Sequence, residues 1–404
     1  MKSTKSAKTL IFFLDALRPD NIGQGTPFMQ EIKKKHTFLP LISLLGYSSG
    51  IHPTIWTGTW QEQHGKFLVY EYNPKASKFK WFRHFSIVPA KLRSFIFAGF
   101  KVPYYYAPWF RKYLPKFYHD RFLQLPPTIE PALAPYFAVD TARFKGHSML
   151  DDIEKKHQIR FMSDHKNPPI FPDACPVDDW ELSDKDIDFF FTYDTDGFGH
   201  SYGPKSKEMA RLLAKIDKSM ARLYREAGKK YDKVNLFVFS DHGMCEVKKF
   251  CDVQKHLAKL KYKCPEDYLV FFDATMVRFW TKNSAVKKAL IGVVKKIPEL
   301  TYIDKRLKDK YHINFKNRRF GDIMCTVAPE TRIFPDYFAP VKAAIKGLHG
   351  YDPWFKHSKG IFLSNCIETA EKEIRVIDVL PTIMSVLSVK PPKGIHGKSI
   401  NRKH

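Results

Sequence analysis

The sequence predicts an α/β protein in which a mostly parallel central sheet is sandwiched by helices and carries inserted cap subdomains. Two patterns in the 404 residues indicate this fold. Short apolar runs, typical of buried parallel strands, end at polar side chains that can carry chemistry. A segment with helical spacing lies between two of these runs, as in a strand–helix–strand unit.

The apolar runs and the polar residues that follow them are 9–14 with Asp15, 187–193 with Asp196, and 234–239 with Asp241 and His242. In an open α/β sheet, ligands bind just beyond the carboxyl ends of the strands. We therefore expect these side chains at one edge of the sheet.

Residues 207–228 are expected to form the helix between the second and third strands. Their apolar side chains recur with a helical period, at Met209, Leu212, Leu213, Ile216, Met220 and Leu223. Gly228 is the expected C-cap, because a glycine often follows the last helical residue.

Two long stretches interrupt the alternation of strands and helices. Residues 66–182 are rich in Pro, Tyr, Phe and Trp, and residues 253–346 contain a basic helical piece near 285–296 and strand-like pieces at 276–280 and 323–328. We expect both stretches to form caps around a catalytic core, which the sequence divides into residues 1–65, 183–252 and 347–404.

The chain is strongly basic, with a formal net charge of +25 and an isoelectric point near 9.6. Such a surface attracts phosphate esters, nucleic acid or an anionic membrane leaflet, and charge alone does not choose among them. The six cysteines form no CxxC pair, so we expect buried reduced thiols instead of a disulfide framework or a zinc knuckle.

The expected compartment is the cytoplasm, or its membrane face. The apolar run at 10–14 is too short for a signal sequence, and no stretch of about 20 apolar residues predicts a membrane span. The sequence carries no information on the oligomeric state.

The first insertion combines aromatic and basic residues, with twelve Lys or Arg against two acids between residues 66 and 121. The residues that interleave there are Phe95, Phe97, Phe100, Tyr104, Tyr105, Tyr106, Trp109 and Phe110 with Lys91, Arg93, Lys101, Arg111 and Lys112. One hypothesis is a cap that contacts an anionic membrane. An ordinary cap with an aromatic core is the alternative, and nucleic acid is the least favoured partner.

Three aspartates, three histidines and one hydroxyl are distributed over five short segments, at Asp15, Ser48, Asp196, His200, Asp241, His242 and His349. Together they are the inventory of a hydrolase with two cations. Oxygen and imidazole ligands without thiolate suit Zn²⁺, and also Mn²⁺ or Mg²⁺.

Ser48 is the candidate nucleophile because it precedes the helix-like segment 52–60. A hydroxyl at a helix N-terminus lies beside free backbone N–H groups, and a metal bound to its oxygen would lower its pKa. An ordinary N-cap is the structural alternative, and Ser49 competes for either role.

The other candidates also have structural alternatives. Gly197 and Gly199 would allow a tight turn that points Asp196 and His200 at one ion, whereas the adjacent Asp241 and His242 could face different ions. A lone aspartate after a strand is often a helix cap, and a lone histidine in a loop is more often structural.

The order of these segments resembles the alkaline phosphatase superfamily, and most of all its type I phosphodiesterase/nucleotide pyrophosphatase branch. The segments that carry the resemblance are Leu14-Asp15-Ala16-Leu17-Arg18, Ser48 with Thr57-Gly58, Glu62-Gln63-His64-Gly65, Asp196 to His200 with Gly203-Pro204, Ser240-Asp241-His242-Gly243-Met244, Ile377 to Thr382 and His396-Gly397-Lys398-Ser399.

The resemblance implies two cation sites, one formed by Asp15, Ser48, Asp241 and His242 and the other by Asp196, His200 and His349. It places Asp241 and His242 on the same ion. Ser48 would attack phosphorus, form a phosphoseryl intermediate and release an alcohol, and a water would then hydrolyse the intermediate. We expect Ser49 and Arg18 to contact the substrate.

The chain departs from the branch next to the nucleophile. The branch commonly has Thr-Phe-Pro-Asn, where this chain has Ser48-Ser49-Gly50-Ile51, so the asparagine that helps to hold the phosphoryl oxygen is replaced by Ile51. The Cys-Xaa-Pro-Ser-Arg signature of a sulfatase does not occur at this position.

The expected function is therefore hydrolysis of a phosphoric ester with two divalent cations, zinc being the favoured metal. A nucleotide, a nucleotide-sugar or a lipid-linked phosphodiester is the expected substrate class. The alternatives are a phosphotransferase or phosphomonoesterase that acts on a lipid- or glycan-linked phosphate, and a non-enzymatic protein that binds phosphorylated glycans or lipids through its basic cap.

Overall fold

The structure is a computed structural model and describes residues 5–77, 79–80, 129, 132–140, 143–161, 177–339 and 341–402. Its largest sheet has seven strands in the order β17-β2-β16-β7-β1-β6-β5. These strands are β1 (Lys5–Leu14), β2 (Thr37–Ile42), β5 (Ile159–Phe161), β6 (Ile187–Thr192), β7 (Tyr231–Phe239), β16 (Gly360–Ser364) and β17 (Ile374–Arg375).

The expected mostly parallel sheet is confirmed. β1 pairs in parallel with both β6 and β7, and β5 pairs in parallel with β6. Within the described strands of this sheet, only β16 runs antiparallel to its neighbours, β2 and β7. All three strands expected from apolar runs are present, and β5 extends the sheet from inside the stretch 66–182 that we expected to form a cap.

The residues of β1 alternate between two apolar layers because successive side chains of a strand point to opposite faces. Ile11 and Phe13 belong to the core on one face, and Leu10, Phe12 and Leu14 to the core on the other. Both faces are therefore buried, as the continuous apolar run predicts.

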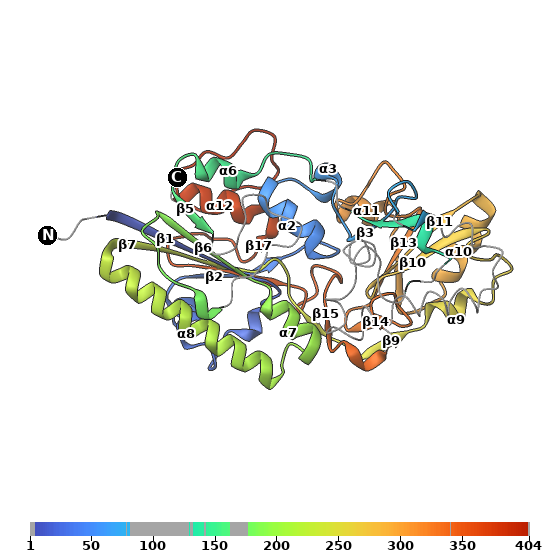
Figure 1. The fold of residues 1–404 in the computed structure, drawn as a ribbon, viewed down its shortest axis with the longest axis horizontal. Helices are drawn as coiled ribbons and strands as arrows, with labels where there is room; N and C mark the ends of the chain where they lie inside the picture. Colours follow the sequence, from blue (N-terminus) through green and yellow to red (C-terminus); the bar gives the residue numbers. More distant parts are fainter. Residues whose placement is uncertain are drawn as a thin grey trace, which may run out of the picture.

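Helices cover both faces of the sheet (Figure 1). One face packs against α1 (Pro27–Lys35) and α8 (Lys207–Lys230), and the other against α2 (Ser48–Thr57), α6 (Met149–Glu154) and α12 (Val379–Val386). The remaining helices of this part are α3 (Gln61–His64) and α7 (Asp194–Tyr202). Short 3-10 helices lie at Pro19–Asn21, Ala134–Tyr136, Val177–Asp179, Lys342–Ala344 and Val376–Asp378.

Helix α8 begins at Lys207, as the sequence predicts, but it ends later than expected. Ser206 caps its N-terminus by accepting a hydrogen bond from the Met209 N–H at 3.1 Å. Gly228, the expected C-cap, lies inside the helix, and Tyr231 is the capping residue. Because β7 starts at Tyr231, the chain passes directly from helix to strand without a left-handed residue.

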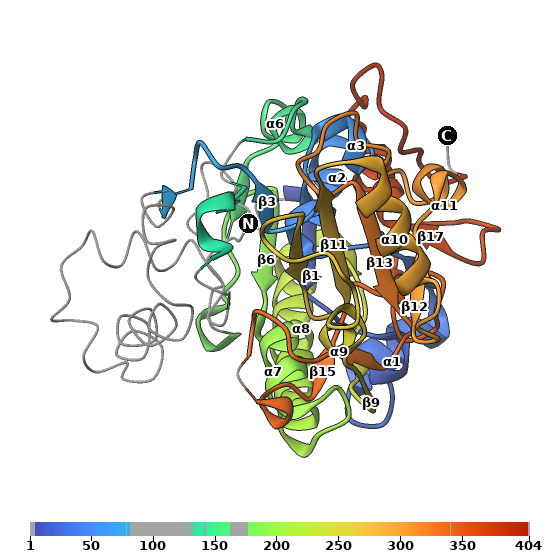
Figure 2. The same ribbon diagram turned by 90° about the vertical axis from the view of Figure 1, so that its right-hand side faces the viewer.

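The second insertion contains a smaller antiparallel sheet in the order β10-β11-β13-β12 (Figure 2). Its elements are α9 (Val253–Leu257), β10 (Tyr268–Phe272), β11 (Met276–Thr281), α10 (Ser284–Val294), β12 (Leu300–Tyr302), α11 (Lys305–Lys310) and β13 (Ile323–Val327). The basic helix and the two strands expected in this stretch are therefore present. α10 packs on the sheet through Val286, Leu290 and Val294.

Three two-stranded ladders connect the parts of the chain. β15 (Gly347–Leu348) pairs with β8 (Cys245–Glu246), β14 (Thr331–Ile333) pairs with β9 (Lys249–Cys251), and β3 (Tyr70–Tyr72) pairs with β4 (Phe137–Val139). The first ladder matters for the site, because it joins the segment after His242 to the segment before His349.

The basic and aromatic residues between Lys91 and Lys112 lie outside the described residues. Contact with an anionic membrane and the cytoplasmic location therefore stay predictions. Within the described ranges, no helix is both long enough and apolar enough to cross a bilayer. Cys245, Cys251 and Cys325 carry buried thiols, as expected, and Cys175 is not among the described positions.

Candidate metal centre

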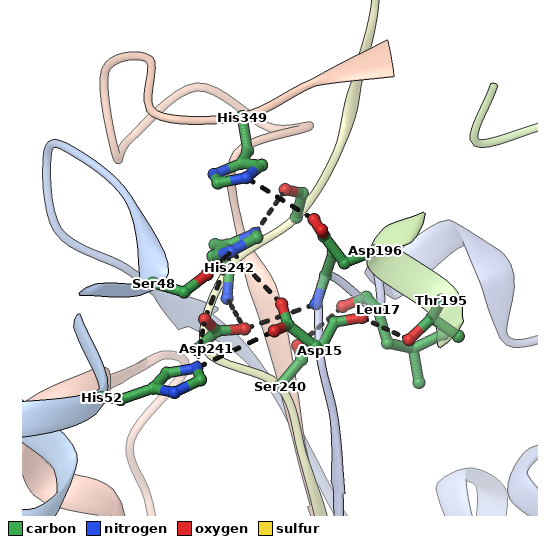
Figure 3. A network of polar contacts seen from close by, with 12 residues as sticks. Asp15, Leu17, Ser48, His52, Thr195, Asp196, Ser240, Asp241, His242 and His349 are labelled. Atoms are coloured by element: carbon green, nitrogen blue, oxygen red, sulfur yellow. Dashed lines mark hydrogen bonds and ion pairs between the residues drawn. The ribbon is translucent and has the colours of Figure 1, made fainter. Parts of the chain in front are cut away.

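All seven predicted ligands lie in one place, beyond the carboxyl ends of β1, β6 and β7, and Figure 3 shows six of them, all but His200. Two clusters of metal-binding side chains occur in the described part of the chain. Asp15, Asp241 and His242 form one, and Asp196, His200 and His349 form the other, with the ligand atoms of each cluster within 4.8 Å of one another.

The strand register explains why residues so distant in sequence meet. Leu14 pairs with Thr192 and Phe13 pairs with Phe239, so the three strands end at the same level. The Asp15 N–H donates to the Thr192 carbonyl at 3.0 Å, which continues the ladder by one residue. The next residues of each strand therefore project into a common space.

Ser48 is the first residue of α2, as expected for a hydroxyl at a helix N-terminus. Gly50 lets this helix pack closely on the backbone at Phe67, since a Cβ at position 50 would lie 2.5 Å from the Phe67 carbonyl oxygen. Ser48 is 6% exposed, and its Oγ lies 3.0 Å from His242 Nε2. The hydroxyl thus belongs to the first cluster.

His242 Nε2 is the centre of the first cluster. It lies 3.3 Å from Asp15 Oδ1, 3.2 Å from Asp241 Oδ2 and 3.0 Å from Ser48 Oγ. Ligand atoms around a tetrahedral Zn²⁺ with bonds of about 2.0 Å lie roughly 3.3 Å apart. His242 Nδ1–H donates to the Gly243 carbonyl at 2.9 Å, so the Nε2 lone pair faces the cluster.

Two residues of the second cluster lie on a helix. The prediction of a tight turn around Gly197 and Gly199 is therefore wrong, because both glycines lie inside α7. Asp196 and His200 lie in α7, and the i,i+4 spacing places both on one helix face. Asp196 Oδ2 is 3.4 Å from His200 Nε2, and Asp196 Oδ1 is 3.5 Å from His349 Nε2. His200 Nδ1–H donates to the Gly347 carbonyl at 2.8 Å, which again turns Nε2 toward the centre.

The two clusters are adjacent because their histidines stack. The rings of His242 and His349 are parallel within 13°, with centroids 3.9 Å apart. Asp241 and His242 belong to the same cluster, in agreement with the family resemblance and against the open alternative of two different ions.

The electrostatics of the centre favour bound cations. Burial, together with the charges of Asp241 and Asp196, raises the pKa of Asp15 well above its usual range. Burial lowers the pKa of His349 well below its usual range, and the neighbouring His242 lowers it further, so the ring is a neutral ligand at pH 7. Although burial opposes it, the charge of Asp196 raises the pKa of His200, so this ring gains positive charge from the same carboxylate. Three carboxylates, of which Asp15 and Asp241 are buried, thus meet in one place and favour positive charge there.

Polar atoms without partners also point to a ligand. Asp15 Oδ1, Asp196 Oδ1 and His349 Nδ1 are buried and accept or donate no hydrogen bond within the described residues. Because unsatisfied buried carboxylate oxygens are costly, oxygen-rich clusters of this kind are usual places for divalent cations. The residues present therefore fit two such ions, and Ser48 would be the fourth ligand of the first.

The two predicted substrate contacts differ in their surroundings. Ser49 follows Ser48 in α2 and is 3% exposed, and its Oγ has no hydrogen-bond partner in the described part of the chain. Arg18 is 1% exposed, and its guanidinium binds Asp20 and the Met244 carbonyl. These contacts give Arg18 a structural role between the loop after Asp15 and the loop after His242.

His52 and Tyr47 are also part of the centre, and neither was predicted from the sequence. His52 Nε2 lies 3.1 Å from Asp241 Oδ2, and the Tyr47 ring meets His349 edge-on at 5.5 Å. A signal for His52 was available, since a helix that starts at Ser48 places the residue four positions later on the same face. Ile51, in place of the asparagine, is fully buried in the core between α2 and the sheet.

Comparison with known proteins finds relatives in sequence and in fold. The curated relatives include the alkaline phosphatase PafA of Elizabethkingia meningoseptica, 24% identical over 265 residues, and the venom phosphodiesterase CdcPDE of Crotalus durissus collilineatus, 29% identical over 233 residues. These matches cover 55% and 52% of this chain. The chain spans less than half of either relative, 47% of the first and 27% of the second.

Solved structures share the fold over nearly the whole chain. Human ectonucleotide pyrophosphatase/phosphodiesterase 5 superposes with a TM-score of 0.64 at 17% identity and covers 97% of both chains. The murine protein, solved in an inactive form in complex with AMP, gives a TM-score of 0.63 at 17% identity, with 96% of each chain covered.

The sequence model described as type I phosphodiesterase / nucleotide pyrophosphatase matches residues 9–352, a range that includes every ligand of both clusters. The chain belongs to the type I phosphodiesterase/nucleotide pyrophosphatase family of the alkaline phosphatase superfamily.

Proposed function

We propose that this protein hydrolyses a phosphoric ester with Ser48 as the nucleophile and two divalent cations, Zn²⁺ being the favoured metal. The position of the Ser48 hydroxyl carries this proposal. Its oxygen lies at the N-terminus of α2 and 3.0 Å from His242 Nε2, inside a cluster that also contains Asp15 and Asp241.

Each of the two clusters would hold one ion. Asp15, Asp241 and His242 would hold one ion together with Ser48, and the residues of the second cluster would hold the other. Two divalent cations supply positive charge to the phosphoryl oxygens and lower the pKa of a bound hydroxyl or water.

The chain's own residues would act in two steps. The Ser48 oxygen forms a bond to phosphorus while the bond between phosphorus and the ester oxygen breaks, and the alcohol leaves with the serine proton. Water then cleaves the phosphoseryl bond, which restores the Ser48 hydroxyl and releases phosphate or a phosphomonoester. The N-terminus of α2 favours the negative charge that develops on the phosphoryl oxygens.

A nucleotide, a nucleotide-sugar or a lipid-linked phosphodiester is the proposed substrate class. The venom relative is named a phosphodiesterase, which supports a diester. The murine structural neighbour was solved with AMP, a nucleotide with one phosphate ester bond, which supports a nucleotide as substrate or product. PafA is named an alkaline phosphatase, so a monoester has to be tested beside the diester.

The experiment compares bis-p-nitrophenyl phosphate with p-nitrophenyl phosphate, using zinc-loaded protein, EDTA-treated protein and the variants Ser48→Ala and Ser49→Ala. We expect EDTA and Ser48→Ala each to lower kcat by roughly 1,000-fold or more, because the nucleophile and its activation act as one unit. Ser49→Ala should retain more activity than Ser48→Ala. Equal activity of wild type and Ser48→Ala would reject the nucleophile.

A further inference from the structure

We infer that His52 is a positioning residue of the metal centre, which donates a hydrogen bond to Asp241 and thereby fixes this carboxylate for the cation. The inference rests on the proposed function, because it assumes that Asp241 is a metal ligand. His52 itself is assigned no bond to the metal and no contact with the substrate.

His52 lies one turn after Ser48 in α2, and its ring points toward Asp241 of the first cluster (Figure 3). The side chain is buried, with 2% of the residue exposed. Its Nε2 is 3.1 Å from Asp241 Oδ2 and 3.8 Å from Asp15 Oδ2. The same helix thus carries the nucleophile on its first residue and a donor to the metal ligands on its fifth.

Aromatic rings surround the rest of the imidazole. Phe13 meets it at 5.0 Å and 66°, Phe191 at 5.9 Å and 88°, and Trp56 at 6.3 Å and 66°. The opposite ring nitrogen, Nδ1, has no hydrogen-bond partner among the described residues. The polar edge of His52 therefore meets the carboxylates and nothing else polar that the structure describes.

This environment selects one tautomer. A proton on Nε2 makes a hydrogen bond to Asp241, and it leaves only a weak acceptor, Nδ1, among the rings. A proton on Nδ1 instead would bury a donor without a partner and set the Nε2 lone pair against the carboxylate oxygen. His52 is thus a donor toward the centre.

The hydrogen bond from His52 completes the support of Asp241. Oδ1 of Asp241 accepts from the backbone N–H groups of Ala16, at 3.3 Å, and His242, at 3.0 Å. Oδ2 faces His242 Nε2 at 3.2 Å and accepts from His52. With donors on both oxygens the carboxylate cannot rotate, so Oδ2 stays directed at the position that the ligands share.

The experiment uses two amide variants that differ by one methylene. In His52→Gln the amide N–H can reach the position of Nε2, whereas the shorter side chain of His52→Asn cannot. His52→Leu removes the donor and keeps an apolar side chain against the rings. The readouts are the zinc dissociation constant from chelator competition, kcat and KM for bis-p-nitrophenyl phosphate, and the melting temperature in EDTA.

We expect His52→Asn and His52→Leu to weaken zinc binding by roughly 10- to 100-fold, the usual effect of losing a hydrogen bond to a metal ligand. His52→Gln should recover most of this loss. The Co²⁺ absorption spectrum of His52→Gln should match that of the wild type, since no ligand is removed. With saturating zinc, kcat should fall in the Asn and Leu variants while KM changes little.

Zinc binding as tight in His52→Asn and His52→Leu as in the wild type would overturn the inference. A Co²⁺ spectrum altered in His52→Gln would also overturn it, because His52 would then be a direct ligand. The inference is also contradicted if zinc affinity stays low in His52→Gln. In that case the zinc affinity follows a general folding defect, which lowers the melting temperature in EDTA in all three variants. If the metal site of the proposed function is wrong, the wild type itself binds no zinc. If only this inference is wrong, the wild type and all three variants bind zinc equally tightly.

Discussion

His242 and His349 stack face to face, with ring centroids 3.9 Å apart, although each belongs to a different ligand cluster. The ladder between β8 and β15 holds them together, since Leu348, next to His349, pairs with Cys245. The distance between the two clusters is therefore set by backbone pairing and not by flexible side chains. Several measurements can test this centre and the elements that support it.

Removal of metal should destabilise the wild type. A cation that binds only the folded state adds about 4 kcal/mol of stability at a concentration of about 1,000 times its dissociation constant. Thermal unfolding with zinc and with EDTA measures this difference.

Asp15→Asn is the matched variant for this experiment. The pKa of Asp15 is raised by burial and by Asp241 and Asp196, so its charge is unfavourable without a cation. The variant should unfold at a higher temperature than the wild type in EDTA and gain less from zinc. A larger zinc effect in Asp15→Asn than in the wild type would contradict the assignment of Asp15 as a ligand.

The stability of the protein should fall in acid partly because of His64. Burial, with a contribution from the charge of Lys66, lowers the pKa of His64 to about 3. Its Nδ1 accepts from the Lys66 N–H at 3.2 Å and its Nε2–H donates to Thr54 Oγ1 at 2.8 Å, a pattern that requires the neutral ring. The stabilisation is therefore present above the unfolded-state pKa, near 6.5, and is lost as the pH falls toward 3.

His64→Asn should accordingly lower the free energy of unfolding at pH 7 and have a smaller effect at pH 4. The difference between wild type and variant should shrink by about 3 kcal/mol between these pH values, at about 1.4 kcal/mol per pKa unit. Urea unfolding at both pH values measures it. His36→Asn, at an exposed position, is the control, and a constant difference for His64→Asn would speak against a neutral buried His64.

Gly50→Ala should affect both stability and activity. The added Cβ would lie 2.5 Å from the Phe67 carbonyl oxygen and 2.7 Å from Gln61 Nε2, so α2 has to move. Overpacking of this kind costs about 1–3 kcal/mol, and the displaced helix carries Ser48 with it, so kcat should also fall. Gly292→Ala in α10 is the control, since no atom lies within 4 Å of its added Cβ.

Gly228→Ala distinguishes an interior helical position from a C-cap. Gly228 lies inside α8 and no atom is within 4 Å of an added Cβ. Alanine should therefore stabilise the protein by about 0.5–1 kcal/mol, because glycine is a poor helix former. A loss of roughly 1 kcal/mol or more would indicate the left-handed C-cap that the sequence suggested.

The sheet was predictable because its strands are continuous apolar runs that end at polar residues. Leu10 to Leu14 is buried on both faces, and this kind of strand leaves a clear trace in the sequence. The end of α8 was not predictable from the sequence. Gly228 fits the usual C-cap pattern, but the helix continues to Lys230.

The ligand clusters were predictable in membership but not in local structure. Gly197 and Gly199 weaken the helix signal around Asp196, yet both lie inside α7. Gly199 packs closely on Met244, since a Cβ there would lie 2.9 Å from its side chain. In this segment, tertiary contacts override the low helix propensity of glycine. His349 carries no strand or helix pattern of its own, and only the family resemblance linked it to Asp196.

The hydrogen bond of 3.0 Å between Tyr47 Oη and Thr275 Oγ1 joins the residue before Ser48, the proposed nucleophile, to the connection between β10 and β11. Gly350 packs closely against the same two residues, since a Cβ at position 350 would lie 3.0 Å from the Tyr47 ring and 3.0 Å from Thr275 Oγ1. The smaller sheet consequently borders the candidate metal centre, and a shift in its packing would reach Ser48 through Tyr47.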